Sequence, residues 1–482
     1  MVTDSERGKY ASPEGSPLIE YLSTFACFML LLSVGCVGGF DSPALGILTG
    51  PDTPISVTGS DITMLAAVVG VGQTIAPTLT IFLGDKFGRK VGLLAIGIPI
   101  IIGWVCVANA SVVSVLGVGR FLGGLSIGLG LTVTPIYLGE IASVKSRGAL
   151  GTLVGTALNV GILFAYVAVP YLKMYTSAYV MLGIAAASVV SVLFVPESPY
   201  FLAMKGDVEG AEEALEKLRG KTDVAEELEI VKETVKKQSE ALKKIGNKRE
   251  DGTSETGPNK FDNFKDIFRV TANRRAYFIN CLLLISLHTG GYTPFLVYGS
   301  MIFEAMNISV GKNVMTIVIG VLQLIFNVVA TFVIDRQGRR PLIRASGMIV
   351  CFCAVAIGVY FYLIEYVNLD LSGYSDFMLV AIFGYMAAFN VGIMPVQLVV
   401  MSETFASEIK ILATLIMGVT GGVLATFCLT MYMTIAVTMN WGHCMPFFGS
   451  AILISITTTL ILKYLPETKG KTFNEIQRDL SV

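Results

Sequence analysis

Two short turns, one in each half of the chain, carry an aspartate, a basic residue, a glycine and an arginine in the same order. The first reads Gly84-Asp85-Lys86-Phe87-Gly88-Arg89-Lys90, and the second reads Asp335-Arg336-Gln337-Gly338-Arg339-Arg340. A guanidinium can hold a carboxylate through two parallel hydrogen bonds, and glycine lets the chain reverse tightly beside it. The two turns therefore predict clusters of ion pairs that occur once in each half.

Glutamates that can pair with these arginines occur at matching places. Glu140 and Glu403 each end an apolar stretch, and Glu140 is followed closely by Arg147. Glu197 and Glu467 lie in the similar phrases Pro196-Glu-Ser-Pro199 and Pro466-Glu-Thr-Lys-Gly470. The residues that we expect in the two clusters are Asp85, Arg89, Glu140, Arg147, Glu197, Asp335, Arg339, Glu403 and Glu467.

The elements that must position these residues are long apolar stretches. The chain has 482 residues, of which 53% are hydrophobic and only 15% charged, and its mean hydropathy is +0.69. Soluble domains are about 25% charged, so this composition is typical of a membrane protein. A bilayer core needs roughly 20 apolar residues per helix, and the chain contains twelve such stretches. We therefore predict an all-α membrane protein with twelve transmembrane helices in two pseudo-symmetric six-helix bundles.

A charged segment between the sixth and seventh stretches divides the chain. In it, Ala211, Leu215 and Leu218 recur at helical spacing, so we expect short helices and then a flexible linker; a linker without helices is the alternative. The expected parts are a cytoplasmic tail at 1–21, a six-helix bundle at 22–196, a cytoplasmic helical linker at 197–274, a second six-helix bundle at 275–465 and a cytoplasmic tail at 466–482.

The lysines and arginines of the short loops indicate which side faces the cytoplasm. Both basic turns share one side, whereas only Lys173 and Lys312 lie on the other. By the positive-inside rule, both termini and both turns are cytoplasmic. There the ion pairs would form a latch that favours opening toward the outside and breaks when the protein opens inward. Alternatively, the charges only anchor helix ends at the membrane surface.

Two charged residues, Asp41 and Arg120, lie inside apolar stretches. Each is about eight residues from the outer end of its stretch, which at about 1.5 Å per residue places both roughly 12 Å below the outer surface. A lone charge in lipid is costly, so we predict that the two residues form a pair. Proton uptake by Asp41 that releases Arg120 would couple proton entry to solute entry. A permanent structural pair in a passive carrier is the alternative.

Other classes of function find little support in the sequence. A net charge of −1 provides no large basic surface for a nucleic acid. His288 and His443 are the only histidines, and no CxxC pair occurs, which argues against a metal centre. Neither a nucleophile–base set nor a phosphate-binding loop is present. We expect no metal, no cofactor and no enzyme activity.

Taken together, these motifs resemble the sugar porter family of the major facilitator superfamily. The similarity covers about residues 20–476 and includes both basic turns, Gly119-Arg120-Phe121 and the two proline–glutamate phrases. The phrase Ser42-Pro43-Ala44-Leu45 is similar to the insect branch of facilitated trehalose transporters. The resemblance implies the twelve-helix fold of that superfamily, alternating access and, for most members, a hexose or disaccharide substrate. Proton-driven members are similar in having an acid on the first helix and an arginine on the fourth.

The expected sugar site departs from the family pattern. The family has a glutamine on its fifth helix, where this chain has Gly155, and paired glutamines and an asparagine on its seventh, where it has Leu287, His288 and Thr293. On the tenth helix, one proline is kept at Pro395, the tryptophan is missing and an acid becomes Asn390. The asparagine–tryptophan pair of the eleventh helix has no counterpart.

Several polar residues remain on the helices that the resemblance places around the cavity. Each one alone is more often a contact between helices than a ligand. Glycines and prolines at Gly290-Gly291, Pro294, Gly392 and Pro395 interrupt two of these helices, which predicts either gates or static kinks. The candidate substrate-binding residues are Asn159, His288, Tyr292, Thr293, Gln323, Asn390 and Gln397.

The function that this pattern favours is alternating-access transport. We expect a plasma-membrane carrier for a hexose, a trehalose-like disaccharide or a related polyhydroxy solute, with protons as a coupling partner if Asp41 titrates. A carrier of a non-sugar organic solute is one alternative, because the sugar-binding amides are depleted. A transporter-like nutrient receptor is another. The intact cytoplasmic motifs favour a carrier over a receptor.

Overall fold

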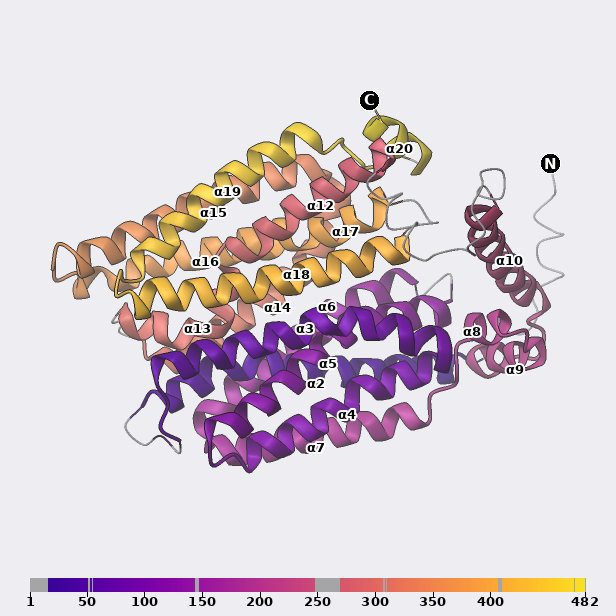
Figure 1. Ribbon diagram of the computed structural model, residues 1–482, viewed down its shortest axis with the longest axis horizontal. Helices are drawn as coiled ribbons and strands as arrows, with labels where there is room; N and C mark the ends of the chain where they lie inside the picture. Colours follow the sequence, from indigo (N-terminus) through magenta and orange to yellow (C-terminus); the bar gives the residue numbers. More distant parts are fainter. Residues whose placement is uncertain are drawn as a thin grey trace.

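A computed structural model describes residues 16–50, 53, 55–143, 147–247, 269–306, 308, 310–405, 410–471 and 473–481. All regular secondary structure in these residues is helical. Twelve helical segments among them are long and apolar enough to cross a membrane. They lie as two groups side by side, the N-terminal half and the C-terminal half (Figure 1). The predicted twelve-helix, all-α membrane fold is therefore confirmed.

Six long helices form the N-terminal half. Apolar side chains occur on all their faces, as expected for helices that contact both lipid and neighbouring helices. Their bounds are α2 Leu18–Leu48, α3 Gly59–Phe87, α4 Arg89–Ala108, α5 Val113–Ile141, α6 Arg147–Tyr171 and α7 Met174–Leu193.

The C-terminal half repeats this arrangement with two interrupted spans. Each of its six spans consists of one helix or of several consecutive helices. Their bounds are α12 Thr271–Thr289 with α13 Tyr292–Ala305, α14 Lys312–Gln337, α15 Arg339–Glu365, η1 Ser372–Phe377 with α16 Met378–Ala388, η2 Phe389–Ile393 and α17 Met394–Thr404, α18 Lys410–Met433 with η3 Thr434–Thr438, and α19 Cys444–Tyr464.

The interruptions occur at the glycines that the sequence indicates. Gly291 has φ +81°, a left-handed conformation that separates α12 from α13. Pro294 does not break this span, because it lies in the first turn of α13, where a backbone N–H is not needed. In the tenth span, Gly392 lies in the π-helical turn η2 and Pro395 in the first turn of α17. A π-turn leaves backbone groups less regularly paired than an α-helix does.

Small residues bring the two halves together along three helix pairs. Helix α3 packs on α18, α6 packs on α14, and α2 packs on α13. The residues that face each other show that α3 and α18 run antiparallel, as do α6 and α14. A Cβ atom on Gly422 would lie 2.8 Å from Thr74 Cα, and one on Gly320 would lie 2.9 Å from Tyr166 Cδ2. Such close approach is typical of membrane helices that meet through small residues.

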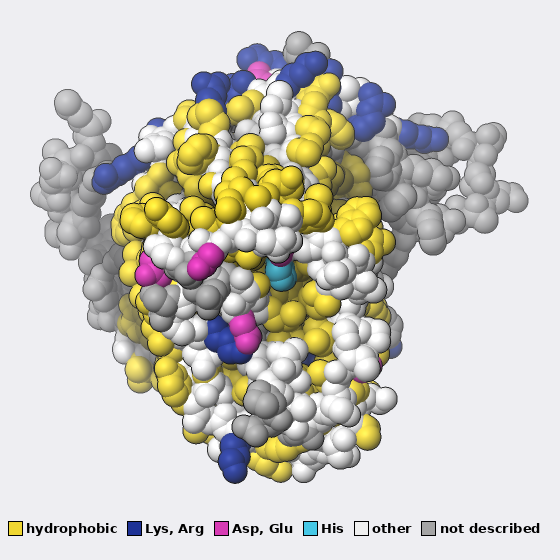
Figure 2. Space-filling model, turned by 90° about the vertical axis from the view of Figure 1, so that its left-hand side faces the viewer, with side chains coloured by type: hydrophobic (Ala, Val, Ile, Leu, Met, Phe, Trp, Pro, Cys, Tyr) yellow, Lys and Arg dark blue, Asp and Glu magenta, His cyan; other side chains and the backbone are white. Residues whose placement is uncertain are grey.

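The direction of α6 and α14 places both basic turns at one end of the molecule. Gly155 meets Asn327 near that end, and Tyr166 meets Gly320 toward the other. The end that carries the basic turns is called the cytoplasmic end below, after the orientation that the positive-inside rule predicts, and the opposite end is called the outer end. Figure 2 shows the outer end, where hydrophobic and uncharged side chains dominate and charged ones are few.

Short helices cover the cytoplasmic end. The linker contains α8 Pro199–Met204, α9 Val208–Arg219 and α10 Ala225–Asn247, as the sequence predicts, and α20 Phe473–Ser481 follows the last span. Arg219 joins this layer to the N-terminal half, since its Nη1 lies 2.7 Å from Glu20 Oε2 and its Nη2 lies 2.5 Å from Glu227 Oε1. Residues 248–268, where a flexible linker is expected, lie outside the described part.

Candidate functional site

Asp41 on α2 and Arg120 on α5 form an ion pair inside the N-terminal half. The contact joins Asp41 Oδ1 and Arg120 Nη2. Arg120 Nη1 and Nη2 also donate to the carbonyl of Val37, each at 3.3 Å, and the guanidinium carbon lies 5.6 Å from the centre of the Phe40 ring. Arg120 is only 3% exposed. Because a buried guanidinium is costly without partners, this arrangement accounts for the pairing predicted from depth.

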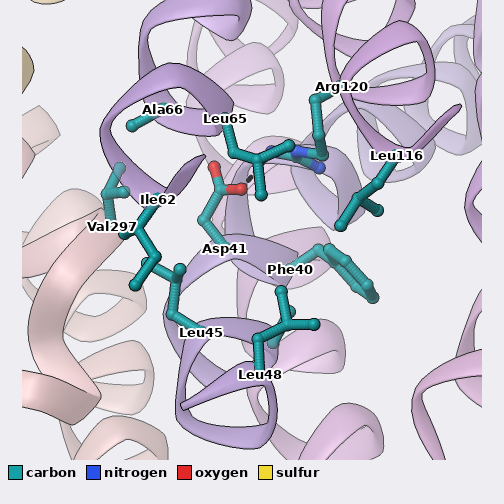
Figure 3. A pocket seen from close by; sticks show the side chains of 11 residues that line it. Phe40, Asp41, Leu45, Leu48, Ile62, Leu65, Ala66, Leu116, Arg120 and Val297 are labelled. Atoms are coloured by element: carbon teal, nitrogen blue, oxygen red, sulfur yellow. Dashed lines mark ion pairs between the residues drawn. The ribbon is translucent and has the colours of Figure 1, made fainter. Parts of the chain in front are cut away.

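A small cavity of about 20 Å³ lies beside this pair (Figure 3). Its only charged lining residues are Asp41 and Arg120, and the other walls are apolar. Leu48 at the end of α2 and Ile62 near the start of α3 place the cavity in the outer half of the membrane. The Asp41 side chain is 15% exposed, so it is the member of the pair that solvent entering from the outer end would reach.

The first basic turn binds two glutamates of its own half. Arg89 Nη2 lies 3.0 Å from Glu140 Oε1, and Arg89 Nε donates to Glu140 Oε2 at 3.1 Å. Glu197 Oε1 accepts hydrogen bonds from the backbone N–H groups of Arg89, at 2.8 Å, and Lys90, at 3.2 Å. Gly88 has φ +106°, and any Cβ there would collide with the Glu197 carboxylate. Only glycine therefore fits this turn.

The second basic turn repeats this arrangement in the C-terminal half. Arg339 Nη2 lies 2.7 Å from Glu403 Oε1. Glu467 accepts hydrogen bonds from the backbone N–H groups of Arg339, at 3.0 Å, and Arg340, at 3.1 Å. Gly338 has φ +87°. The structure thus brings together the arginine and the two glutamates expected at each turn.

Each cluster joins helices of one half only. Among the interactions between described residues, no hydrogen bond or ion pair joins the two halves at the cytoplasmic end. The pairs of Arg89 with Glu140 and of Arg339 with Glu403 thus each lie within one half. A latch that breaks on inward opening stays a prediction. The side chains of Asp85, Arg147 and Asp335, also expected in the clusters, lie outside the described part.

Three polar side chains near the middle of the membrane are buried with unused hydrogen-bonding atoms. Gln323 on α14 is 1% exposed, and neither its amide oxygen nor its amide nitrogen has a partner within the described residues. The same holds for Nδ1 of His288 on α12 and for Oδ1 of Asn390 on η2. An unpaired buried polar atom costs about 1–3 kcal/mol, so these atoms favour a site that a polar ligand fills.

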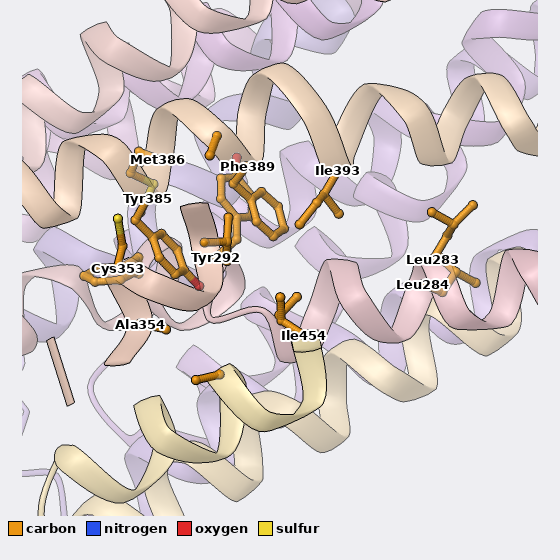
Figure 4. Close-up of a cluster of buried hydrophobic side chains, with 14 of the residues drawn as sticks. Leu283, Leu284, Tyr292, Cys353, Ala354, Tyr385, Met386, Phe389, Ile393 and Ile454 are labelled. Carbon is orange, nitrogen blue, oxygen red and sulfur yellow. The ribbon is translucent and has the colours of Figure 1, made fainter. Parts of the chain in front are cut away.

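Aromatic rings of Tyr292, Tyr385 and Phe389 lie at the interrupted spans (Figure 4). Tyr292 stacks on Phe389, with ring centres 4.7 Å apart and an interplanar angle of 4°. The hydroxyl of Tyr385 is buried, without a partner in the described residues, and would meet any Cβ placed on Gly291. Flat rings beside amides offer both the apolar face and the polar contacts that a sugar-like solute needs.

The other candidate residues, Asn159, Gln397 and Thr293, give weaker support to a substrate site. Asn159 Nδ2 donates to the carbonyl of Gly155 in its own helix at 2.9 Å. Gln397 Nε2 makes only a long contact of 3.9 Å with Met401 Sδ. Thr293 lies in the first turn of α13 and is half-buried. Asn159 is thus already satisfied in part by its own helix.

Comparison with known proteins decides the family. A family model described as sugar (and other) transporter matches residues 20–480. The chain belongs to this transporter family. It is therefore a multi-pass membrane transporter rather than a member of an enzyme family, as the sequence motifs predict.

Relatives and solved structures resemble the transporter along its whole length. It is 29% identical over 474 residues to "Sugar transporter ERD6-like 6" of Arabidopsis thaliana, covering 95% of this chain and 90% of that protein. It is 28% identical over 497 residues to "Facilitated trehalose transporter Tret1" of Bombyx mori, covering 100% and 93%. The partially occluded, inward-open structure of the xylose transporter XylE from E. coli has a TM-score of 0.69 at 20% identity, covering 94% and 98%. This structural similarity confirms the major facilitator fold.

Sequence reasoning missed two contacts between the halves of the transporter. Ser42 Oγ and Ser300 Oγ share a hydrogen bond of 3.0 Å, and Ser300 N donates to Ser42 Oγ at 2.9 Å. Asn327 on α14 faces Gly155 on α6. Serine is common in packed membrane helices, so Ser42 carried no distinctive signal. Asn327 follows Gln323 by one helical turn, and this spacing was the signal that could have found it.

Proposed function

We propose that this transporter moves a sugar, either a hexose or a trehalose-like disaccharide, or a related polyhydroxy solute by alternating access. The observation that carries the proposal is the set of buried polar atoms on Gln323, His288 and Asn390 that have no partner within the described residues. The stacked rings of Tyr292 and Phe389 at the interrupted spans add aromatic surface. Hydroxyl groups can both donate to and accept from such atoms. The named relatives, a sugar transporter and a trehalose transporter, agree with this substrate class.

Uptake by purified protein in liposomes tests the proposal. The panel would contain labelled glucose, xylose, trehalose and a polyol, together with a glycoside as a non-sugar organic solute. We expect saturable uptake of at least one sugar or polyol, inhibited by an excess of the same unlabelled compound. Uptake of the glycoside alone would show that the substrate is a non-sugar organic solute. Binding without uptake would indicate a receptor.

We further propose that Asp41 couples transport to protons. The support is geometric, because Asp41 borders a cavity in the outer half and its sole ionic partner among the described residues is Arg120 on another helix. Protonation of Asp41 would end this pairing and free α2 to move relative to α5. In this step, one carboxylate carries one proton per transport cycle.

The variant Asp41→Asn tests coupling because asparagine keeps the shape of aspartate without titrating. With an inward proton gradient, the wild type is expected to accumulate solute, whereas the variant should only equilibrate it. Glu304→Gln is the matched control, because Glu304 is an exposed carboxylate at the outer end that pairs with Lys312. Accumulation by Asp41→Asn against the solute gradient would rule out the coupling role.

We also propose a plasma-membrane location with both termini and both basic turns in the cytoplasm. The asymmetry of lysines and arginines between the two ends supports this orientation. Epitope tags at either terminus of the protein in intact cells should be accessible to antibodies only after the cells are permeabilised. Staining of either tag before permeabilisation would contradict the proposed orientation.

A further inference from the structure

Gly155 and Asn327 meet across the interface between the two halves. A Cβ atom on Gly155 would lie 2.9 Å from Asn327 Nδ2 and 3.3 Å from Asn327 Oδ1. The amide of Asn327 thus occupies the space in which a side chain at position 155 would lie. Because Gly155 of α6 has no side chain, it leaves the space that the Asn327 amide of α14 fills.

None of the hydrogen bonds found among the described residues involves the Asn327 amide. Within the described part of the chain, the hydrogen bond of this residue involves its backbone carbonyl, which accepts from Thr331 Oγ1 at 3.3 Å. The side chain is half-buried in a membrane span, where a polar group needs a partner. Its amide is therefore free to bind a solute between the halves.

The neighbours of Asn327 extend the polar strip toward the middle of the membrane. Gln323 lies one helical turn away on the same face of α14, and both of its amide atoms are buried without a partner in the described residues. Asn159 lies one turn from Gly155 on α6. Gly320 continues the same face of α14, where it contacts Tyr166 and Leu163 of α6.

We propose that Asn327 is a specificity-determining residue, which binds a hydroxyl group of the solute at the cytoplasmic end of the site, and that Gly155 is required to make room for it. This inference rests on the proposed function and deepens it. An amide offers one acceptor and two donor hydrogens, so Asn327 and Gln323 together can bind two neighbouring hydroxyls of a polyhydroxy solute. Through these two residues of α14, the C-terminal half supplies the polar contacts to this part of the solute.

Transport kinetics of Asn327→Leu test the inference, because leucine has a similar size but forms no hydrogen bonds. Loss of one hydrogen bond to a neutral hydroxyl is expected to raise KM about three- to tenfold, with a smaller change in kcat. The solute is the best-transported sugar or polyol of the panel. A series of its monodeoxy analogues then locates the hydroxyl, since the variant and the matching deoxy compound should not have additive effects.

Three further variants control the experiment. Thr331→Val lies one turn from Asn327 on the same helix and should keep KM within about twofold. Gly155→Gln should weaken transport by displacing Asn327, and Gly155→Gln with Asn327→Ala should recover part of it by supplying an amide from α6 instead. Asn327→Ala replaces the leucine variant if the latter does not elute as a folded protein from a sizing column, because the alanine side chain also forms no hydrogen bonds.

The possible outcomes separate the two proposals. If the wild type transports none of the sugars or polyols, the proposed function fails, and this inference with it. If the wild type transports one of them and the Asn327 variants keep its KM and its preference among deoxy analogues, only the inference is overturned. A raised KM that is the same for all deoxy analogues would also overturn it, because a structural defect has no preferred hydroxyl.

Discussion

At the scale of single residues, Glu197 and Glu467 explain why each basic turn is followed at a distance by a glutamate. Each carboxylate accepts hydrogen bonds from the first backbone N–H groups of a helix, Glu197 at the start of α4 and Glu467 at the start of α15. These N–H groups have no partner within the helix, and the helix dipole favours a negative charge beside them. The two glutamates therefore fix where α4 and α15 begin.

The pKa of Glu467 gives this role a measurable consequence. Partial burial raises the pKa, but the backbone N–H groups of Arg339, Arg340, Lys469 and Thr468 lower it by more, so the net pKa lies below the usual value. A lowered pKa in the folded state stabilises the protein above the unfolded pKa of about 4.3, and the contribution is lost as the pH falls through the folded value.

We predict that Glu467→Gln lowers the free energy of unfolding by about 1 kcal/mol at pH 7, a value that allows for solvent screening at a half-buried site. The difference from the wild type should shrink as the pH falls below about 4. Chemical denaturation in detergent, followed from pH 7 to pH 3, measures it. Glu213→Gln, at an exposed carboxylate that pairs with Lys217, is the control and should show little difference at either pH. An equal loss for Glu467→Gln at all pH values would contradict the role of its charge.

At the scale of elements, the seventh span is divided into two helices because one residue has a left-handed conformation. Gly291 has φ +81°, and the Tyr385 hydroxyl of α16 lies where its Cβ would be. The aromatic stack of Tyr292 on Phe389 then ties the start of α13 to the π-turn of the tenth span. The two interrupted spans are thus joined at their interruptions, so movement of one is transmitted to the other.

We predict that Gly291→Ala destabilises the folded protein by about 1–3 kcal/mol, because alanine disfavours this conformation. Thermal unfolding in detergent and the initial rate of uptake in liposomes measure the effect. The double variant Gly291→Ala with Tyr385→Phe should recover part of the loss, since it removes the collision with the hydroxyl. Gly449→Ala in α19 is the control, because a Cβ there meets no atom within 4 Å. Unchanged stability of Gly291→Ala would mean that α12 and α13 can form one continuous helix.

How far the sequence predicts the structure also depends on the element. Long apolar stretches predict all twelve spans, and the strong chemistry of arginine predicts its partners, as with Arg120 and Asp41 or Arg89 and Glu140. The candidate site was harder to predict, because the contact of Asn327 with Gly155 depends on how the halves approach each other. The number of residues between two polar groups in different helices does not determine how far apart they lie in the structure. Small residues such as Gly155 also give no sign in the sequence that they face a polar side chain.

At the scale of the whole molecule, contacts between the halves are made at the outer end as well as near the middle of the membrane. Ser42 and Ser300 are buried, with 0% and 1% exposure, and join α2 to α13. Glycines allow this approach, since a Cβ on Gly299 would lie 3.3 Å from Ser42 Oγ and one on Gly46 would lie 3.5 Å from Ser300 Cβ. Ser42 directly follows Asp41, so opening of the outer end must break this hydroxyl contact beside the ion pair.

We predict that Ser42→Ala with Ser300→Ala shifts the conformational equilibrium toward states that are open at the outer end. Loss of the hydroxyl contact in a closed interface should change this equilibrium about three- to tenfold. A cysteine introduced as Leu45→Cys, in the wall of the outer cavity, reports the shift through its rate of labelling by a membrane-impermeant maleimide. The protein without Leu45→Cys measures labelling of the eight native cysteines.

Ser177→Ala provides the matched comparison for this experiment. Ser177 is equally buried near the outer end, but its hydroxyl donates to Met174 O within the N-terminal half, at 2.7 Å. Its loss should therefore leave the labelling rate of Leu45→Cys unchanged, because it does not affect contact between the halves. If the double serine variant labels no faster than Ser177→Ala while remaining folded, the Ser42–Ser300 hydroxyl contact does not contribute to closure of the outer end. Faster labelling would instead show that hydrogen bonds between α2 and α13 contribute to closure, next to the residue proposed to carry the proton.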